Sequence, residues 1–277
     1  MKTPLHLGVL SVSMLLVCVG CPDPKTETPQ ATISLPSVLA PIPESPITAD
    51  EGKPGRLQKL PNVEPATRVF VVEPETAGPA AAVLLVHSIW GLDSETRSVA
   101  RDLAASGFVV AAPDLFDGLE PSSRIVTNEL LKANNPARTQ AILDSALDLL
   151  VKSPRTQGKK IVMVGLAVGG QWAMPWLDTD RGLAAVALDS SALMSTPPCR
   201  GFKGPMLLLS GGESMSFQPA VLEKIVRTYA DAGVTVRTQP IEGAGTDLFD
   251  AQAKGFSAAA RSEALAKLLE FLRTSTR

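Results

Sequence analysis

The stretch VGLAVGGQ, residues 164–171, decides how the rest of the sequence is interpreted. Its first residue, Val164, ends the apolar run KIVMV, and glycines stand at 165 and 169, two residues on either side of Ala167. Where a strand turns sharply into a helix, the central residue takes a positive φ and only small neighbours fit around it. Such a turn presents a nucleophile in many α/β enzymes. Here the central residue is alanine, whose methyl group cannot attack a carbonyl carbon.

Short apolar runs alternate with helical patterns on both sides of this turn. Near-continuous apolar runs are typical of strands that are buried on both faces. We therefore expect an α/β fold with a mostly parallel sheet and helices on both faces. The turn at residues 164–171 resembles that of the α/β-hydrolase type, which the resemblance implies for this sheet. The expected strands are 67–74, 80–88, 108–114, 160–166, 183–189, 205–212 and 234–242, and the expected helices are 93–107, 137–153, one from about 168, 219–233 and about 253–273. Between the strand at 108–114 and the helix at 137–153 lies a polar stretch.

The N-terminus has the pattern of an export signal. Lys2 precedes an apolar run, residues 7–20, that is too short to span a membrane comfortably as a mature helix. Gly20 before Cys21 resembles a bacterial lipobox, although Cys18 stands where leucine is usual. We expect residues 1–20 to be a lipoprotein signal peptide, and the lipid on Cys21 to anchor the protein to a membrane of the bacterial cell envelope. The alternatives, a plain secretory signal or a single anchor helix, also export the protein.

The segment after Cys21 is rich in proline. Eight prolines lie between residues 22 and 55, among Thr, Ser, Glu and Ala. No helical or strand period survives this density of proline, so we expect a disordered tether over residues 21–60, followed by one domain over 61–277. The alternative is an ordered, irregular extension that packs on the domain.

Composition excludes several classes of function. The chain has 26 basic and 28 acidic residues, so no basic excess suggests a nucleic-acid partner. It has no Walker A motif, no GxGxxG after a strand and no metal-ligand spacing of Cys and His, so we expect no cofactor and no metal site. Once Cys18 is cleaved away and Cys21 carries lipid, Cys199 is the only thiol left, which excludes an intramolecular disulfide.

Five sequence blocks, in order over about residues 68–273, resemble the dienelactone hydrolase family of α/β hydrolases. GLAVGG is similar to that family's Gly-x-Cys-x-Gly-Gly elbow, LLVHSIWGLD to its oxyanion loop, and GFVVAAPDLFDG to its strand that ends in Pro-Asp-Leu-aromatic. LLLSGGES resembles the stretch that ends in the catalytic Asp, and PIEGAGTDLF the one that ends in Ala-Gly-His.

The resemblance assigns the nucleophile to Ala167, the acid to Ser214 and the base to Thr246. None of these side chains can perform the assigned role, because the reaction needs an activated nucleophile, an imidazole-like base and a group that orients the base. Ser88 also stands where the family's loop usually carries glutamate. We therefore expect no catalytic residue, and a pseudoenzyme that binds a ligand or a protein partner.

The oxyanion hole is made of backbone, so the amides of Ile89 and Val168 are expected to survive and to suit a small carbonyl or carboxylate ligand. The candidate cleft residues are His87, Ser88, Trp90, Glu213 and Asp247. The alternative function is an ester or lactone hydrolase whose rebuilt site uses His87 with Glu213 or Asp247. The scarcity of histidine favours the pseudoenzyme: His6 lies in the expected signal, and the expected role of His87 is to bond loop backbone.

Overall fold

The computed structural model describes residues 47–48, 52–121, 123–189, 199–212, 218–245, 247–251, 253 and 255–277. The expected signal peptide, Cys21 and most of the expected tether lie outside the described residues. So do three residues of the expected site: Glu213, Ser214 and Thr246. All described residues belong to one unit, Pro36–Arg277.

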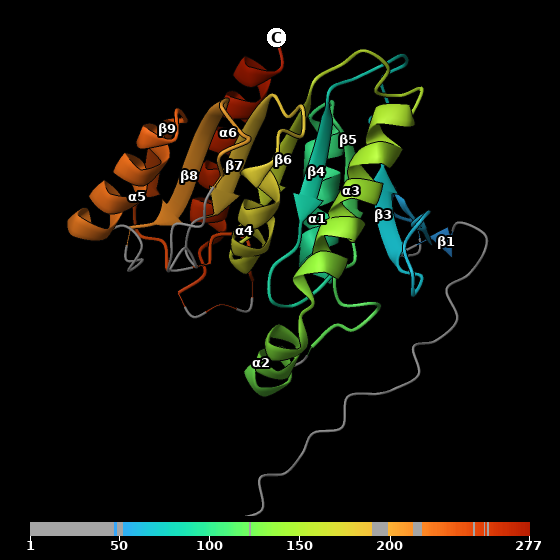
Figure 1. Cartoon of the computed structure of the whole chain (residues 1–277), viewed down its shortest axis with the longest axis horizontal. Helices are drawn as coiled ribbons and strands as arrows, with labels where there is room; N and C mark the ends of the chain where they lie inside the picture. The colour runs from blue at the N-terminus through green and yellow to red at the C-terminus, as the bar shows by residue number, and fades with distance from the viewer. Residues whose placement is uncertain are drawn as a thin grey trace, which may run out of the picture. The chain divides into compact units, whose positions relative to one another are not determined.

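A nine-stranded sheet runs through this unit (Figure 1). Neighbouring strands are parallel from β5 to β9, and the three pairs at the other end are antiparallel. The strands of the parallel part are buried along most of their length, except for β9 at the edge. In sheet order the strands are β1 (Ile47–Thr48), β2 (Arg56–Lys59), β3 (Arg68–Val72), β5 (Val109–Pro113), β4 (Ala82–Val86), β6 (Ile161–Gly165), β7 (Ala185–Asp189), β8 (Pro205–Gly211) and β9 (Thr235–Ile241).

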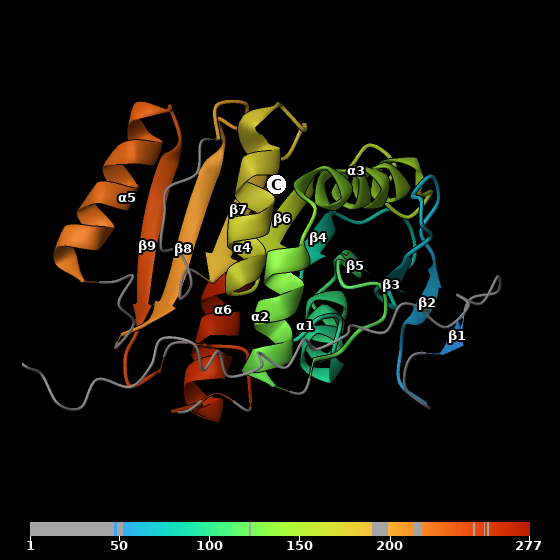
Figure 2. The same cartoon turned by 60° about the horizontal axis from the view of Figure 1, so that its bottom comes forward.

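Helices cover both faces of the sheet (Figure 2). The helices α1 (Ser94–Ala105) and α6 (Ala258–Ser275) share one hydrophobic core with the strands. Its members include Val99, Leu103 and Leu268 of the helices and Val83 and Val164 of the strands. On the opposite face lie α3 (Pro136–Lys152) and α4 (Val168–Ala173), and α4 continues into a 3₁₀ turn, Met174–Asp178. Helix α5 (Pro219–Asp231) packs beside β9. The predicted mostly parallel sheet with helices on both faces is confirmed.

Two elements differ from the sequence-based expectation. The strand β2 lies inside the expected tether of residues 21–60. Its residues pair with β3 and Leu57 belongs to the core, so the domain includes residues before the expected start at 61. Helix α2 (Arg124–Ala133) occupies the polar stretch between β5 and α3. Its N-cap is Ser123, and only Thr127 and Leu130 are buried, so its apolar period was too sparse to predict a helix.

Helix α6 begins at Ala258, later than the expected start near residue 253, because the Ser257 side chain caps it by accepting from the Ala260 backbone N–H at 3.3 Å. None of the described helices is both long and apolar enough to cross a membrane.

Candidate functional site

The predicted sharp turn between β6 and α4 is present. Ala167 has φ 46° and ψ −119°, a conformation that a residue with a Cβ adopts only under strain. The flanking glycines are required by close backbone contacts. A Cβ at Gly169 would lie 2.7 Å from the Val86 carbonyl oxygen, and one at Gly165 would lie 2.8 Å from the Gly170 Cα. The turn is therefore pressed against the end of β4, and Ala167 stands at its apex.

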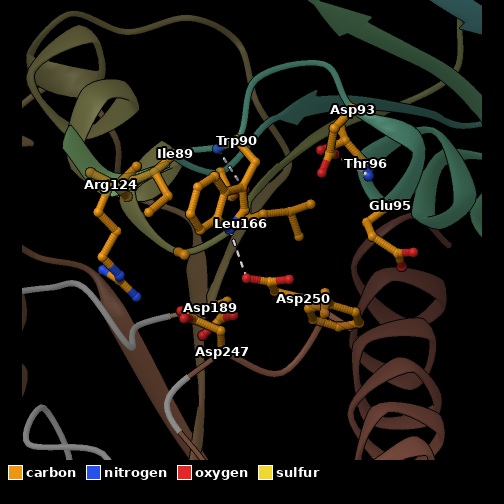
Figure 3. Close-up of a pocket in the computed structure, with 14 residues that line it drawn as sticks. Ile89, Trp90, Asp93, Glu95, Thr96, Arg124, Leu166, Asp189, Asp247 and Asp250 are labelled. Carbon is orange, nitrogen blue, oxygen red and sulfur yellow. Dashed lines mark hydrogen bonds between the residues drawn. The ribbon is translucent and has the colours of Figure 1, made fainter. Parts of the chain in front are cut away.

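A cavity of about 260 Å³ opens at the carboxyl ends of β4, β6 and β7 (Figure 3). This is the edge where open α/β sheets place their ligands. Ala167, only 8% exposed, contributes to its lining. The apolar part of the lining consists of Ile89, Trp90, Leu166, Ala167, Val168 and Phe249.

The polar part of the lining is strongly acidic. It contains five carboxyl side chains and one guanidinium, and it consists of Ser88, Asp93, Glu95, Thr96, Arg124, Asp189, Asp247 and Asp250. Asp250 accepts a hydrogen bond of 2.7 Å from the Trp90 indole Nε1–H. Asp93 caps helix α1 by accepting from the Thr96 backbone N–H at 2.9 Å.

Six of these polar residues were not predicted as site residues from the sequence: Asp93, Glu95, Thr96, Arg124, Asp189 and Asp250. Asp189 ends β7 and is only 3% exposed. Its place directly after a buried parallel run is a signal that could have identified it, because such strand ends meet at the ligand-binding edge. Arg124 comes from the unpredicted helix α2, and Asp250 from the loop after β9, so neither carried a comparable signal.

The structure brings most of the other expected site residues together. Ser88, Trp90 and Asp247 line the cavity, as do Ile89 and Val168. Within the described part of the chain, neither the Ile89 nor the Val168 backbone N–H donates a hydrogen bond. These two amides are therefore available to an oxygen atom of a ligand.

His87 does not line the cavity, which corrects its place among the candidate cleft residues. Its expected role of bonding loop backbone is confirmed. Its side chain is fully buried, with Nδ1 2.7 Å from the Ser88 carbonyl oxygen, to which it donates, and Nε2 accepting from the Leu115 backbone N–H at 3.0 Å. The ring also packs edge-on against Phe116 and Trp172. Burial lowers the pKa of His87 below its usual value of 6.5. The imidazole thus holds two loops together as a neutral ring.

The described lining residues offer little nucleophilic chemistry. They include no histidine, cysteine, lysine or tyrosine. The Thr96 hydroxyl donates to the Gly91 carbonyl oxygen at 3.2 Å, and the Ser88 hydroxyl accepts from the Trp90 backbone N–H at 3.3 Å. No group of three or more His, Cys, Asp or Glu side chains among the described residues is placed to hold a metal ion.

Ser214 and Thr246, to which the resemblance assigns the acid and the base, cannot be placed because both lie outside the described residues. The described segments that precede these two positions do lie against each other. A Cβ at Gly211, at the end of β8, would overlap the backbone oxygen of Gly245. Asp247 then lines the same cavity as Ala167, which lies 80 residues earlier in the chain.

Comparison with known proteins gives a consistent result. The model of the dienelactone hydrolase family matches residues 67–276. A "Putative carboxymethylenebutenolidase" from Methylorubrum extorquens is 24% identical over 194 residues, which cover 64% of this chain and 66% of that relative, just under two thirds of its length. A protein of the same name from Saccharolobus solfataricus is 26% identical over 74% of this chain and 93% of its own length.

The solved structures agree on the fold. A dienelactone hydrolase-like promiscuous phosphotriesterase from metagenomic libraries superimposes with a TM-score of 0.70 at 17% identity, covering 81% of this chain and 100% of that chain. At this identity the likeness concerns the fold alone.

Proposed function

Because this chain belongs to the dienelactone hydrolase family, we propose that its domain is a degenerate member that binds a small ligand without cleaving it. The observation that carries the proposal is the residue at the apex of the elbow. Ala167 keeps the strained backbone of a nucleophile position and lines the cavity, yet its methyl group can form no acyl-enzyme. The domain would then be a pseudoenzyme.

Two further features support binding without cleavage. The Ile89 and Val168 amides, which line the cavity, suit a carbonyl or carboxylate oxygen of the ligand. Both ring nitrogens of His87, the one histidine among the described residues, bond loop backbone, so no described imidazole is free to activate a nucleophile or a water molecule. The proposal further takes Ser214 and Thr246 as the degenerate acid and base positions.

We also propose that the protein is an exported lipoprotein of the bacterial cell envelope. Support comes from the sequence: residues 1–20 have the pattern of a signal peptide, and Cys21 stands at the lipobox position. The lipid on Cys21 would hold the domain at a membrane through the proline-rich segment. The ligand-binding domain would then act at the membrane surface.

The competing function is hydrolysis of an ester or lactone, which the names of the relatives favour. A hydrolase that uses His87 conflicts with the position of that ring, because its two nitrogens bond Ser88 and Leu115. A rebuilt site would instead have to rely on Asp247 or Glu213 to activate a water molecule.

An esterase assay separates the two functions. We expect the full-length protein to hydrolyse neither p-nitrophenyl acetate nor a small lactone above the buffer rate. The triple variant Ala167→Ser, Ser214→Asp, Thr246→His restores the three roles and should gain weak turnover. Ala167→Ser alone is the matched control and should gain almost none, because triad members act as a unit. Robust hydrolysis by the wild type that is lost in Asp247→Asn would replace the pseudoenzyme with the rebuilt hydrolase.

A further inference from the structure

The cavity concentrates negative charge that the chain as a whole does not have. Over 277 residues the formal net charge is only −2. The cavity lining alone has five carboxyl side chains and one guanidinium. Inside a cleft with apolar walls, field lines are focused and charge–charge interactions are stronger than in open water. The charge of the ligand therefore matters at this site.

The carboxyl groups lie on both sides of the cavity. Figure 3 shows Asp189 and Asp247 close together, with Asp250 nearby, below the Trp90 ring. Asp93 and Glu95 lie on the other side, at the start of helix α1. A ligand that rests on the elbow is thus flanked by acidic side chains.

The aromatic part of the wall suits the same kind of ligand. The Trp90 indole and the Phe249 ring both line the cavity. The hydrogen bond from Trp90 Nε1–H to Asp250, 2.7 Å long, fixes the indole in the wall. A fixed aromatic ring attracts a cation to its face, most strongly when the ring is an indole.

We propose that the ligand of this cavity is an organic cation that also carries a neutral carbonyl group. The carbonyl oxygen would accept from the Ile89 and Val168 amides, and the ammonium group would lie among the carboxylates and the Trp90 ring. A carboxylate ligand would instead place like charges together. This inference rests on the proposed function, since it takes the elbow cavity as the binding site, and it narrows the ligand class there.

Removing the charge of Arg124 should have the opposite effect on cation binding to removing the charge of a carboxylate. Arg124 is an exposed residue of α2, and its guanidinium points toward Asp189 and Asp247 in Figure 3. It forms no ion pair in the described part of the chain. Its positive charge opposes that of a cationic ligand, so its removal should strengthen binding of a cation.

The experiment compares three small probes by isothermal titration calorimetry on the full-length protein, in a buffer with EDTA. Acetylcholine has the proposed cation and carbonyl. Its uncharged isostere, 3,3-dimethylbutyl acetate, keeps the shape and the ester, and 4,4-dimethylpentanoate presents a carboxylate. We expect acetylcholine to bind about tenfold more tightly than the isostere, and the carboxylate to bind more weakly than either.

Four variants assign the effect to the cavity. Asp189→Asn and Asp247→Asn should each weaken acetylcholine about fivefold and leave the isostere unchanged, whereas Arg124→Gln should tighten acetylcholine a few-fold. Asp231→Asn, at the exposed end of α5, removes a carboxylate far from the lining and should change nothing. Because Asp189 is buried, Arg124→Gln at an exposed position keeps the test decisive if Asp189→Asn does not fold.

Each contrary outcome has a distinct meaning. Three results would overturn the inference of a cationic ligand and leave the proposed pseudoenzyme standing. They are equal binding of acetylcholine and the isostere, no binding of acetylcholine at millimolar concentration, and variants that leave the affinity for acetylcholine unchanged. Saturable Ca²⁺ binding without EDTA, lost in Asp247→Asn and accompanied by no binding of acetylcholine, would overturn that inference in favour of a metal site. Release of acetate from acetylcholine would overturn the non-catalytic function itself, whatever the affinities.

Discussion

A single residue, Ala167, combines a costly backbone conformation with an inert side chain. A residue with a Cβ at φ 46° and ψ −119° costs on the order of 1–3 kcal/mol. The turn persists because Gly165 and Gly169 let α4 approach β4 closely and so determine the path of the chain. In a hydrolase this strain presents the nucleophile. Here the turn presents the methyl group of an alanine instead.

Ala167→Gly should therefore stabilise the protein. Glycine adopts a positive φ without steric cost, although its greater freedom in the unfolded chain offsets part of the gain. We expect the free energy of unfolding in urea to rise by about 1 kcal/mol. The control is Ala173→Gly, because Ala173 is fully buried and has an ordinary helical conformation. This substitution should lower the free energy of unfolding. A loss of stability in Ala167→Gly would show that this backbone is not strained.

His87 should make stability depend on pH. Its pKa in the folded protein is below 6.5, because burial disfavours the charged ring. Above about pH 6.5 the His87 ring is mostly neutral in both the folded and the unfolded protein. Below that pH the unfolded chain binds a proton on this ring and the folded protein resists doing so, so the free energy of unfolding falls as the pH falls. Between about pH 6.5 and pH 5.5 the wild type should lose up to about 1 kcal/mol more than His87→Gln in urea unfolding.

The control for this measurement is His6→Gln, which removes the only other histidine and should keep the wild-type dependence. An equal loss of stability in the wild type and in His87→Gln would mean that the buried ring does not resist protonation.

At the scale of elements, β2 extends the sheet beyond the residues that match the family. The family match begins at residue 67, yet Arg56–Lys59 pairs along its whole length with β3. Leu57 in this strand and Leu60 directly after it are both buried. Nothing in the sequence indicated this strand, because it directly follows a proline-rich segment and its four residues are too few to show a strand period.

Limited proteolysis should detect this boundary. We expect trypsin or thermolysin to cut the proline-rich segment before residue 55 and to leave a resistant fragment that includes β2. Leu57→Asp would place a charge in the core beside Phe70, so β2 should detach and the fragment should begin near residue 60. Mass spectrometry of the fragments measures both start points. A wild-type fragment that begins after residue 60 would contradict the pairing of β2 in solution.

At the scale of the whole molecule, the proposal joins a ligand-binding domain to a lipid anchor. Two signals of the sequence support the anchor: the apolar run before Gly20 and the cysteine that follows it. Eight prolines then separate Cys21 from the domain. This arrangement would keep the cavity near a membrane without burying the domain in it.

Cys21→Ala should release the protein from the membrane. In a bacterial host we expect the wild type in the membrane fraction, with a mass increase from lipid, because lipidation needs the Cys21 thiol. The variant should remain unlipidated, and its share in the membrane fraction should fall. Cys199→Ala, which removes a buried thiol of the domain, is the matched control and should behave like the wild type. Equal recovery of wild type and Cys21→Ala in the soluble fraction would refute the anchor.

Much of the fold was predictable because its signals are local. Buried parallel strands leave continuous apolar runs, and α1 is marked by its cap Asp93 and by Gly107 just beyond its end. The strained turn at Ala167 was predictable from the small residues around it. Each of these features depends on neighbours within a few residues, so the sequence by itself determined the α/β alternation and the inert elbow.

The tertiary structure alone decided which further polar residues surround that elbow. Asp189, Asp250 and Arg124 come from three separate elements and become neighbours only when the sheet and its loops assemble. His87 lies next to the oxyanion loop in sequence, yet its ring turns away from the cavity because Leu115 and Ser88 supply its hydrogen bonds. The charge of a cavity and the direction of a buried ring are properties of contacts between distant residues, which no local pattern records.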